Sequence, residues 1–256
     1  MTPTEVVIAL VTAAFVDFNP DAARDLMKPD YIQHNPAVPT GAEPLLGVLP
    51  ALKDSGFTAE PHRIIAEGDF VVTHATYGNA QVFGADTLVA FDVFRIEDGK
   101  VAEHWDNLQP LAGPNPSGRT MTDGPTEVTD LDKTEANKAL VVEFVKTVLQ
   151  GGDASHITDY ISVDGYAQHN PQIADNLDGL GAALGALADQ GITMVYTETP
   201  LVVAQGNFVF TGSEGTFGGE PTAFFDLFRV ADGKIVEHWD VIQAIPSEAA
   251  NDNGKF

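Results

Sequence analysis

The 256-residue sequence contains no cysteine, and its basic residues are few. Without cysteine there are no disulfides, thiolate nucleophiles, cysteine-ligated zinc sites or iron–sulfur clusters. Lysine and arginine number 13 against 37 aspartates and glutamates, which gives a formal net charge of -24. Such an acidic surface repels nucleic-acid phosphates and anionic lipid headgroups, so we expect neither nucleic acid nor a membrane as a partner.

Long hydrophobic runs are also lacking, and residues 6–16 form the one candidate for a targeting segment. This run has no basic residues before it, follows Glu5 and is too short to span a bilayer. We therefore interpret it as a buried helix and expect a cytoplasmic protein. The hydrophobic content of 44% and charged content of 20% are typical of a folded globular chain.

One segment of the chain occurs twice. Residues 91–109 return as residues 225–243 with twelve of nineteen positions identical, and Gln-His-Asn-Pro occurs at residues 33–36 and 168–171. Two distant motifs with nearly the same separation indicate that a whole unit is duplicated. We predict one domain over residues 1–118, a linker over 119–131 and a second domain over 132–256.

The order of predicted elements is the same in both copies. In the first, helices at residues 4–17, 20–27 and 42–54 precede strands at 58–66, 70–77, 87–96 and 101–108. In the second, helices at 133–149, 155–161 and 177–189 precede strands at 193–203, 208–214, 222–230 and 235–242. Helices followed by hairpins predict an α+β fold, in which a curved sheet around a helix leaves a cone-shaped cavity.

The hairpin around the Asp98-Gly99 turn decides which side chains share a face. A strict two-residue loop would pair Val93 with His104. A three-residue loop with a bulge at the glycine would instead pair Asp92 with His104. We favour the bulged register because it places a carboxylate beside an imidazole where both are buried.

In that register, Asp92, His104 and Asp106 project together, and Asp226, His238 and Asp240 do the same in the second copy. A carboxylate beside a histidine fixes its tautomer and raises its pKa, which suits acid–base chemistry near neutral pH. We take these six residues as catalytic candidates. The alternative is a buried polar pair that only specifies the register of the sheet.

Three further histidines are catalytic candidates. His34 and His169 belong to the repeated Gln-His-Asn-Pro, and we expect them to close over the cavity from the helical layer. His74 lies on a predicted strand on which Gly212 and Gly215 replace His74 and Tyr77 in the second copy. This asymmetry suggests a first cavity with more polar groups, while drift at a solvent-facing position is the alternative.

The candidate substrate contacts are aromatic: Tyr31, Tyr77, Trp105, Tyr166 and Trp239. The two tryptophans are interpreted either as packing anchors or as substrate stackers. A metal site of two histidines and a carboxylate would draw on His34, His74, His104 and Asp106. Because no close-spaced ligand pair stands out beyond the hairpin, we expect no metal.

The repeated motifs carry a resemblance to a known family. With Gln-His-Asn-Pro, Phe-Val-Val-Thr-His after a Gly-Asp turn, and Phe-Asp-x-Phe-Arg-x-x-Asp-Gly-Lys-x-x-Glu-His-Trp-Asp, the chain resembles the SnoaL-like polyketide cyclase group of the nuclear transport factor 2-like (NTF2-like) superfamily. The resemblance implies two tandem cone-shaped α+β barrels, each with N-terminal helices on a strongly curved mixed, mainly antiparallel sheet. Because members dimerise through their sheets, the halves are expected to form a pseudo-dimer, and further homo-oligomers stay open.

The resemblance also implies a reaction class, because members include cyclases, ketosteroid isomerases, dehydratases and epoxide hydrolases. We expect a cofactor-independent enzyme for cyclisation, isomerisation or hydration of a small, largely apolar carbonyl compound. His104, oriented by Asp92 or Asp106, would remove a proton, and His34 or His74 would donate a hydrogen bond to the enolate. Gln109 departs from the cyclases, which have an acid shortly after the tryptophan. The alternative is a non-catalytic small-molecule-binding or scaffold module.

Overall fold

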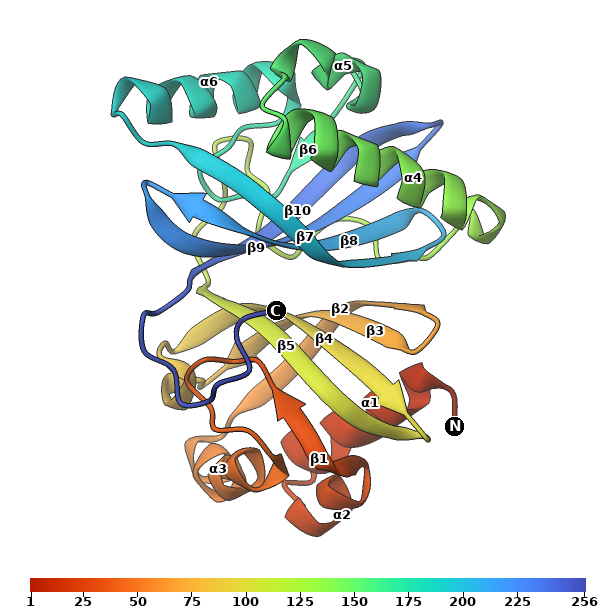
Figure 1. Ribbon diagram of the computed structural model, residues 1–256, viewed down its shortest axis with the longest axis vertical. Coiled ribbons are helices and arrows are strands. Elements are labelled where there is room, and N and C mark those ends of the chain that lie inside the picture. Colours follow the sequence, from red (N-terminus) through yellow and green to blue (C-terminus); the bar gives the residue numbers. More distant parts are fainter. The chain divides into compact units, whose positions relative to one another are not determined.

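The computed structural model describes residues 1–256, which form two compact units. Unit 1 comprises Met1–Leu111 together with Ile245–Phe256, and unit 2 comprises Ala112–Ala244. Each unit holds one five-stranded sheet with its helices on one face (Figure 1). These units differ from the repeats predicted from the sequence. Residues 112–131, predicted as the end of the first domain and the linker, belong to unit 2, and residues 245–256, predicted in the second domain, belong to unit 1.

The helices of unit 1 lie where the apolar patterns predict them: α1 (Pro3–Val11), which continues as the π-helical η1 (Thr12–Val16), α2 (Pro20–Asp25) and α3 (Ala42–Ser55). A capping box starts α1, because the Thr2 side chain accepts from the Glu5 N–H while the Glu5 carboxylate accepts from the Thr2 N–H. Helix α3 ends at Gly56, whose φ of 71° suits glycine. A short 3₁₀ turn, η2 (Gln81–Phe83), follows later.

The sheet of unit 1 is mixed and has the strand order β1-β5-β4-β3-β2. Its strands are β1 (Met27–Gln33), β2 (Thr58–Glu67), β3 (Phe70–Gly78), β4 (Thr87–Glu97) and β5 (Lys100–Pro110). The sequence did not predict β1, which runs parallel to β5 and pairs Gln33 with His104. Pro29 and Asp30 weaken its strand pattern, but an edge strand tolerates both.

The β4–β5 hairpin has neither of the two registers considered from the sequence. Asp98 and Gly99 both have positive φ, 52° and 74°, so they form a tight two-residue turn. One residue further along, Ala102 is an extra residue of β5 between the pairs Ile96–Val101 and Arg95–Glu103.

This bulge sets the pairing along the rest of the hairpin. Phe94 faces His104, and Asp92 faces Asp106. The predicted pairing of Asp92 with His104 is therefore wrong. The three polar side chains nevertheless share one face of the sheet, because residues 92 and 94 alternate in phase with residues 104 and 106.

Unit 2 repeats this architecture, with the strand order β6-β10-β9-β8-β7. Its helical segments are η3 (Leu131–Lys133), α4 (Thr134–Phe144), η4 (Val145–Gln150), η5 (Ala154–His156), α5 (Ile157–Tyr160) and α6 (Asn176–Asp189). Its strands are β6 (Ala167–Gln168), β7 (Met194–Gln205), β8 (Phe208–Phe217), β9 (Glu220–Ala231) and β10 (Lys234–Ala244). The hairpin bulge recurs at Val236, so Asp226 faces Asp240.

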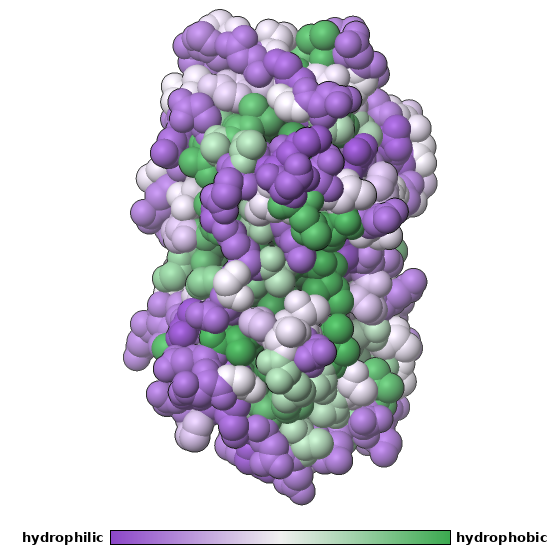
Figure 2. Space-filling view, turned by 90° about the vertical axis from the view of Figure 1, so that its right-hand side faces the viewer, coloured by the Kyte–Doolittle hydropathy of each residue, from purple (hydrophilic) through white to green (hydrophobic).

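The core of each unit lies between its helices and the sheet face that they cover, called here the inner face. In unit 1, Val6 and Leu10 of α1 and Leu49 of α3 pack with Val71 of β3. Hydrophilic side chains cover much of the surface seen in Figure 2, in keeping with the 37 acidic residues. Among the helices, none combines the length and the apolar character that crossing a bilayer requires.

Candidate functional site

A cavity of about 60 Å³ lies between the inner face of the unit 1 sheet and its helices. Apolar side chains from α1, η1 and α3 form one side of it: Leu10, Val11, Ala14, Phe15 and Leu45. Polar side chains from the strands and from the segment after β1 form the other: Tyr31, Gln33, Asn35, Tyr77, Asp92, His104 and Asp106. This volume is well above the roughly 15 Å³ that one water molecule needs, so the cavity has room for water or for one small organic group.

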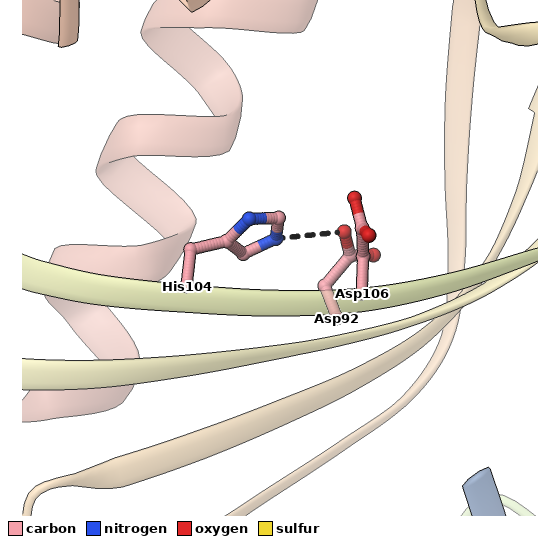
Figure 3. Close-up of side chains that lie close together, drawn as sticks. All are labelled: Asp92, His104 and Asp106. Atoms are coloured by element: carbon pink, nitrogen blue, oxygen red, sulfur yellow. Dashed lines mark hydrogen bonds and ion pairs between the residues drawn. The ribbon is translucent and has the colours of Figure 1, made fainter. Parts of the chain in front are cut away.

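Asp92, His104 and Asp106 rise from the neighbouring strands β4 and β5 on the inner face (Figure 3). All three are buried, with exposed fractions of 4%, 8% and 6%. His104 Nε2 lies 3.1 Å from Asp92 Oδ1. The sequence prediction that these three side chains project together agrees with this arrangement.

The contacts of His104 fix where its protons are. Gln33 Oε1 accepts the Asn35 backbone N–H at 2.9 Å and also lies 3.1 Å from His104 Nδ1. Nδ1 therefore carries a hydrogen. Its other nitrogen, Nε2, faces a carboxylate oxygen of Asp92. Since two acceptors repel each other, a proton lies between them, and the His104–Asp92 pair stores one transferable proton.

The second oxygen of Asp92 accepts two further hydrogen bonds, from the Tyr77 hydroxyl at 2.6 Å and from Thr73 at 3.4 Å. Burial, followed by the charge and hydrogen bond of Asp92, raises the pKa of Tyr77 well above its ordinary value. Burial and the charges of Asp106 and Asp92 raise the pKa of Tyr31 in the same way. Both phenols therefore stay protonated, and the Tyr77 hydroxyl donates to Asp92.

Asp106 differs from Asp92 in having one free oxygen. Its Oδ2 accepts from the Asn35 side chain at 2.8 Å, whereas its buried Oδ1 has no hydrogen-bond partner. A buried polar atom without a partner costs about 1–3 kcal/mol of stability. A fold that keeps this oxygen unpaired keeps an acceptor available to a ligand.

Unit 2 holds the same three residue types. His238 lies between Asp226 Oδ1, 2.9 Å from Nε2, and Gln168 Oε1, 3.0 Å from Nδ1. Burial lowers the pKa of His238, but the hydrogen bond and charge of Asp226 raise it more, so the pKa lies above its ordinary value. Burial raises the pKa of Asp240. Both of its oxygens lie near the Asn170 amide nitrogen, at 3.1 and 2.8 Å.

The structure places His34 and His169 on the outer face of each sheet, and not over the cavity as expected from the sequence. His34 contacts Glu103 at 2.9 Å and stacks on Trp105, both of which alternate with the cavity-lining His104. His169 contacts Glu237 at 2.9 Å in the same way. Each histidine directly follows an edge strand, His34 after β1 and His169 after β6, and successive residues of extended backbone point to opposite faces.

His74 is also on the outer face. It pairs with Phe91 of β4, and the two rings stack with centroids 4.3 Å apart. Its neighbour Thr73 points inward and bonds Asp92. The loss of a histidine at Gly212 in the second copy therefore does not reduce the polar groups of a cavity.

The two tryptophans lie outside the cavities as well, since Trp105 and Trp239 stack on His34 and His169 at 4.7 and 4.6 Å. Of the three tyrosines expected to contact a substrate, Tyr31 and Tyr77 line the unit 1 cavity. Tyr166 is buried in unit 2, where its hydroxyl accepts from Gln168 at 3.3 Å.

The four residues considered for a metal site, His34, His74, His104 and Asp106, are not brought together, because two of them lie on the outer face. Asp92, His104 and Asp106 instead offer ligand atoms within 4.8 Å of one another, as do their counterparts in unit 2. This spacing would also fit a bound cation. That the protein needs no metal stays a prediction.

The sequence reasoning missed Gln33 and Asn35, which contact His104 and Asp106. Their signal was present, because both residues belong to the repeated Gln-His-Asn-Pro. Extended backbone puts the first and third residues of that motif on one face and the histidine on the other.

Comparison with protein families shows to which family the two repeats belong. The family model described as the SnoaL-like domain matches residues 7–104 and again residues 141–238, together more than half of the chain. The chain belongs to the SnoaL-like family. The expected fold, two tandem NTF2-like α+β domains, is thereby confirmed. A comparison with curated proteins finds no match.

Several solved structures resemble part of this SnoaL-like chain. TsrD from Streptomyces laurentii is 22% identical over 43% of this chain and 90% of its own, with a TM-score of 0.36. IdmH from Streptomyces antibioticus, named as a candidate polyketide cyclase, is 21% identical over 43% of this chain and 93% of its own, with a TM-score of 0.35. An epoxide hydrolase of the LEH-like type from M. tuberculosis is 19% identical over 42% of this chain and 82% of its own, with a TM-score of 0.35.

Proposed function

We propose that the unit 1 cavity catalyses cofactor-independent proton transfer on a small, largely apolar carbonyl compound. Asp106 removes a proton from the carbon beside the carbonyl group, and Tyr31 donates a hydrogen bond to the oxygen of the developing enolate. Isomerisation and aldol-type cyclisation follow from this step, and hydration of a conjugated carbonyl compound reaches the same enolate by addition of water to the β-carbon. The sequence alone suggested His104 as the base, and the contacts of the site favour Asp106 instead.

The free oxygen of Asp106 is the observation that carries this proposal. His104 has an acceptor at each ring nitrogen, so no lone pair is open to take a proton from a substrate. Both oxygens of Asp92 are bonded as well. Among these groups, only Asp106 Oδ1 combines basicity with no hydrogen-bond partner, and a general base must lie within hydrogen-bond reach of its proton or one water away.

Tyr31 supports the role of donor. Its hydroxyl oxygen accepts from Gln33 Nε2 at 3.1 Å, which leaves its hydrogen to point elsewhere. Its raised pKa keeps the phenol protonated near neutral pH. A neutral donor in a water-excluded site stabilises an enolate more than the same group does in water.

The His104–Asp92 pair serves as the proton reservoir. It holds one proton between Nε2 and Oδ1, and Tyr77 completes the chain at Oδ2. Return of a proton to a different substrate carbon would complete an isomerisation. The apolar side chains of α1, η1 and α3 favour a substrate whose remaining surface is hydrocarbon.

The test uses the full chain and cyclohexanone in heavy water, with NMR to follow loss of the protons beside the carbonyl. We expect exchange above the buffer rate, and we expect Asp106→Asn to lower the enzyme-dependent rate by about 100-fold or more. The matched control is Asp240→Asn in unit 2, which should keep most of the exchange.

Two outcomes would overturn the proposal. Equal loss in Asp106→Asn and Asp240→Asn would show that unit 1 has no special role. Saturable binding of the ketone without exchange would instead support the non-catalytic binding module, in which the same polar groups only orient a ligand.

A further inference from the structure

The segment that follows the second repeat packs on the first. Ile245–Phe256 belongs to unit 1, and Figure 1 shows it in dark blue beside β1 and β5. The Ala250 N–H donates to the Pro36 carbonyl at 2.7 Å. The Asn251 side chain donates to the carbonyls of Asn35 and Val38, each at 2.8 Å. This tail therefore supplies donors to backbone that has left the sheet.

The same tail reaches the backbone of the site residues. The Asn253 side chain donates to the Gln33 carbonyl at 2.8 Å. Lys255 is 7% exposed, and its ammonium donates to the carbonyl of Asp106. Strand β1 pairs with β5 only as far as His104, so the Asp106 carbonyl lies beyond its last strand partner. Lys255 takes the place of that partner.

The segment that follows the first repeat makes the corresponding hydrogen bonds to the backbone of unit 2. Residues 112–131 belong to that unit, and the Asn115 side chain donates to the carbonyls of Gln168 and Ile173. The Thr120 carbonyl lies 2.8 Å from His169 Nδ1, just as the Gly254 carbonyl lies 3.0 Å from His34 Nδ1.

We propose that the two tails are exchanged positioning elements, each holding in place the polar side chains on the inner face of the other repeat's sheet. The chain of contacts is short. The tail holds the backbone of Gln33 and Asn35, whose side chains set the proton of His104 and bind the carboxylate of Asp106. In unit 2, Asn115 holds the backbone beside Asn170 and Asp240 in the same manner. The importance of this device for catalysis rests on the proposed function, but the contacts do not.

A reciprocal pair of variants tests the exchange. Asn251→Ala and Asn115→Ala are made in the full chain with ¹⁵N-labelled histidine, and NMR follows the imidazole signals. We expect Asn251→Ala to shift the ring signals of His104 and leave those of His238, and Asn115→Ala to do the reverse. The exposed His156 is an internal reference that should not move in either variant.

Hydrogen exchange gives a second readout. The His34 N–H donates to the His104 carbonyl, and the His169 N–H donates to that of His238, both at 2.9 Å. We expect Asn251→Ala to speed exchange at His34 by about tenfold and not at His169. Lys255→Met should reproduce the His104 shift, and Lys255→Arg, which keeps a donor, should restore the original signal.

Each remaining outcome overturns the inference. The tails are not exchanged positioning elements if a tail variant shifts the histidine signals of the repeat that precedes it in sequence. The same holds if it shifts the signals of His104 and His238 equally, or shifts neither. The readouts need no turnover. If each variant shifts the histidine of the other repeat but the protein exchanges no ketone protons, the inference stands and the proposed function fails. If the protein exchanges ketone protons without these shifts, the proposed function stands and the inference fails.

Discussion

In each copy a tyrosine hydroxyl bonds the equivalent aspartate carboxylate, but the tyrosine lies on a different strand in the two copies. In unit 1, Tyr77 of β3 bonds Asp92, and its cross-strand neighbour on β2 is the small Ala59. In unit 2, the phenol comes from Tyr196 of β7, which bonds Asp226, and the facing residue of β8 is Gly215. The large and small residues have thus exchanged places across one strand pair.

Gly215 shows why the phenol of unit 2 comes from β7. A Cβ atom at this position would lie 1.8 Å from the Val195 carbonyl oxygen, so no side chain fits. The duplicated site preserved a contact and not a residue. The sequence difference at Tyr77 and Gly215 suggested a lost polar group, whereas the structure shows a replaced one.

The strength of the two phenol contacts gives the largest expected effect. Tyr77 lies 2.6 Å from its carboxylate, and Tyr196 lies 3.3–3.4 Å from its own. Because hydrogen bonds to charged groups contribute about 1.5–3 kcal/mol, we expect Tyr77→Phe to destabilise unit 1 by about 2 kcal/mol. Tyr196→Phe should cost unit 2 about 1 kcal/mol. Peptide-resolved hydrogen exchange measures each unit separately, and equal losses would contradict the comparison.

The helices show a second difference between the copies. The two family matches start at residues 7 and 141 and have the same length, and superposing their starts places Phe144 opposite Leu10 and Val148 opposite Ala14. Phe144 meets Phe228 edge to face with ring centroids 5.7 Å apart. Bulkier side chains therefore stand in unit 2 where Leu10 and Ala14 line the cavity of unit 1.

Exchanging these side chains between the two units tests whether they cause that difference. Leu10→Phe should fill the unit 1 cavity and weaken cyclohexanone binding about tenfold or more, at about 1–2 kcal/mol of strain. Phe144→Leu should cost about 1 kcal/mol and open space beside Phe228, which the Phe144 ring contacts. Ketone titration followed by NMR reports both effects. Unchanged binding in Leu10→Phe would show that the ligand does not enter this cavity.

The smallest expected effect is a pH dependence in unit 2. The pKa of His238 is raised above its ordinary value of 6.5, so the folded state favours the imidazolium. Its contribution is fully present below about pH 6.5 and is lost as the pH rises through the higher folded pKa. The raised pKa of Asp240 acts in the same sense at lower pH.

Hydrogen exchange between pH 6 and 9, corrected for intrinsic rates, measures this loss. Unit 2 should lose stability as the pH rises over that range, and His238→Gln should flatten the slope. An unchanged slope in the variant would assign it to other groups. The same measurement on unit 1 tests whether its stability depends on pH as that of unit 2 does.

The sequence predicted the helices and the long strands because their apolar periods and turn residues are strong local signals. It missed β1, whose Pro29 and Asp30 carry no strand pattern and whose existence depends on pairing with distant β5. That single omission placed His34 in the helical layer and over the cavity. Parallel pairing is a tertiary property, and a local pattern does not contain it.

The site was predicted in part. Grouping Asp92, His104 and Asp106 required only the correct alternation, which survived the wrong register. Ala102 could not be recognised as a bulge, because nothing in its residue type distinguishes it from a paired position. The contact of Asn251 with the first repeat was equally hidden, since it joins residues 213 or more positions apart.

The path of the tails has a consequence for dissecting this chain. A cut near residue 131 would yield two fragments that each contain one complete sheet, yet each would carry a tail whose hydrogen-bond partners lie on the other fragment. Neither fragment alone would reproduce the native environment of its buried acids. Mixing the two should restore it by complementation, because each fragment supplies the tail that hydrogen-bonds to the other.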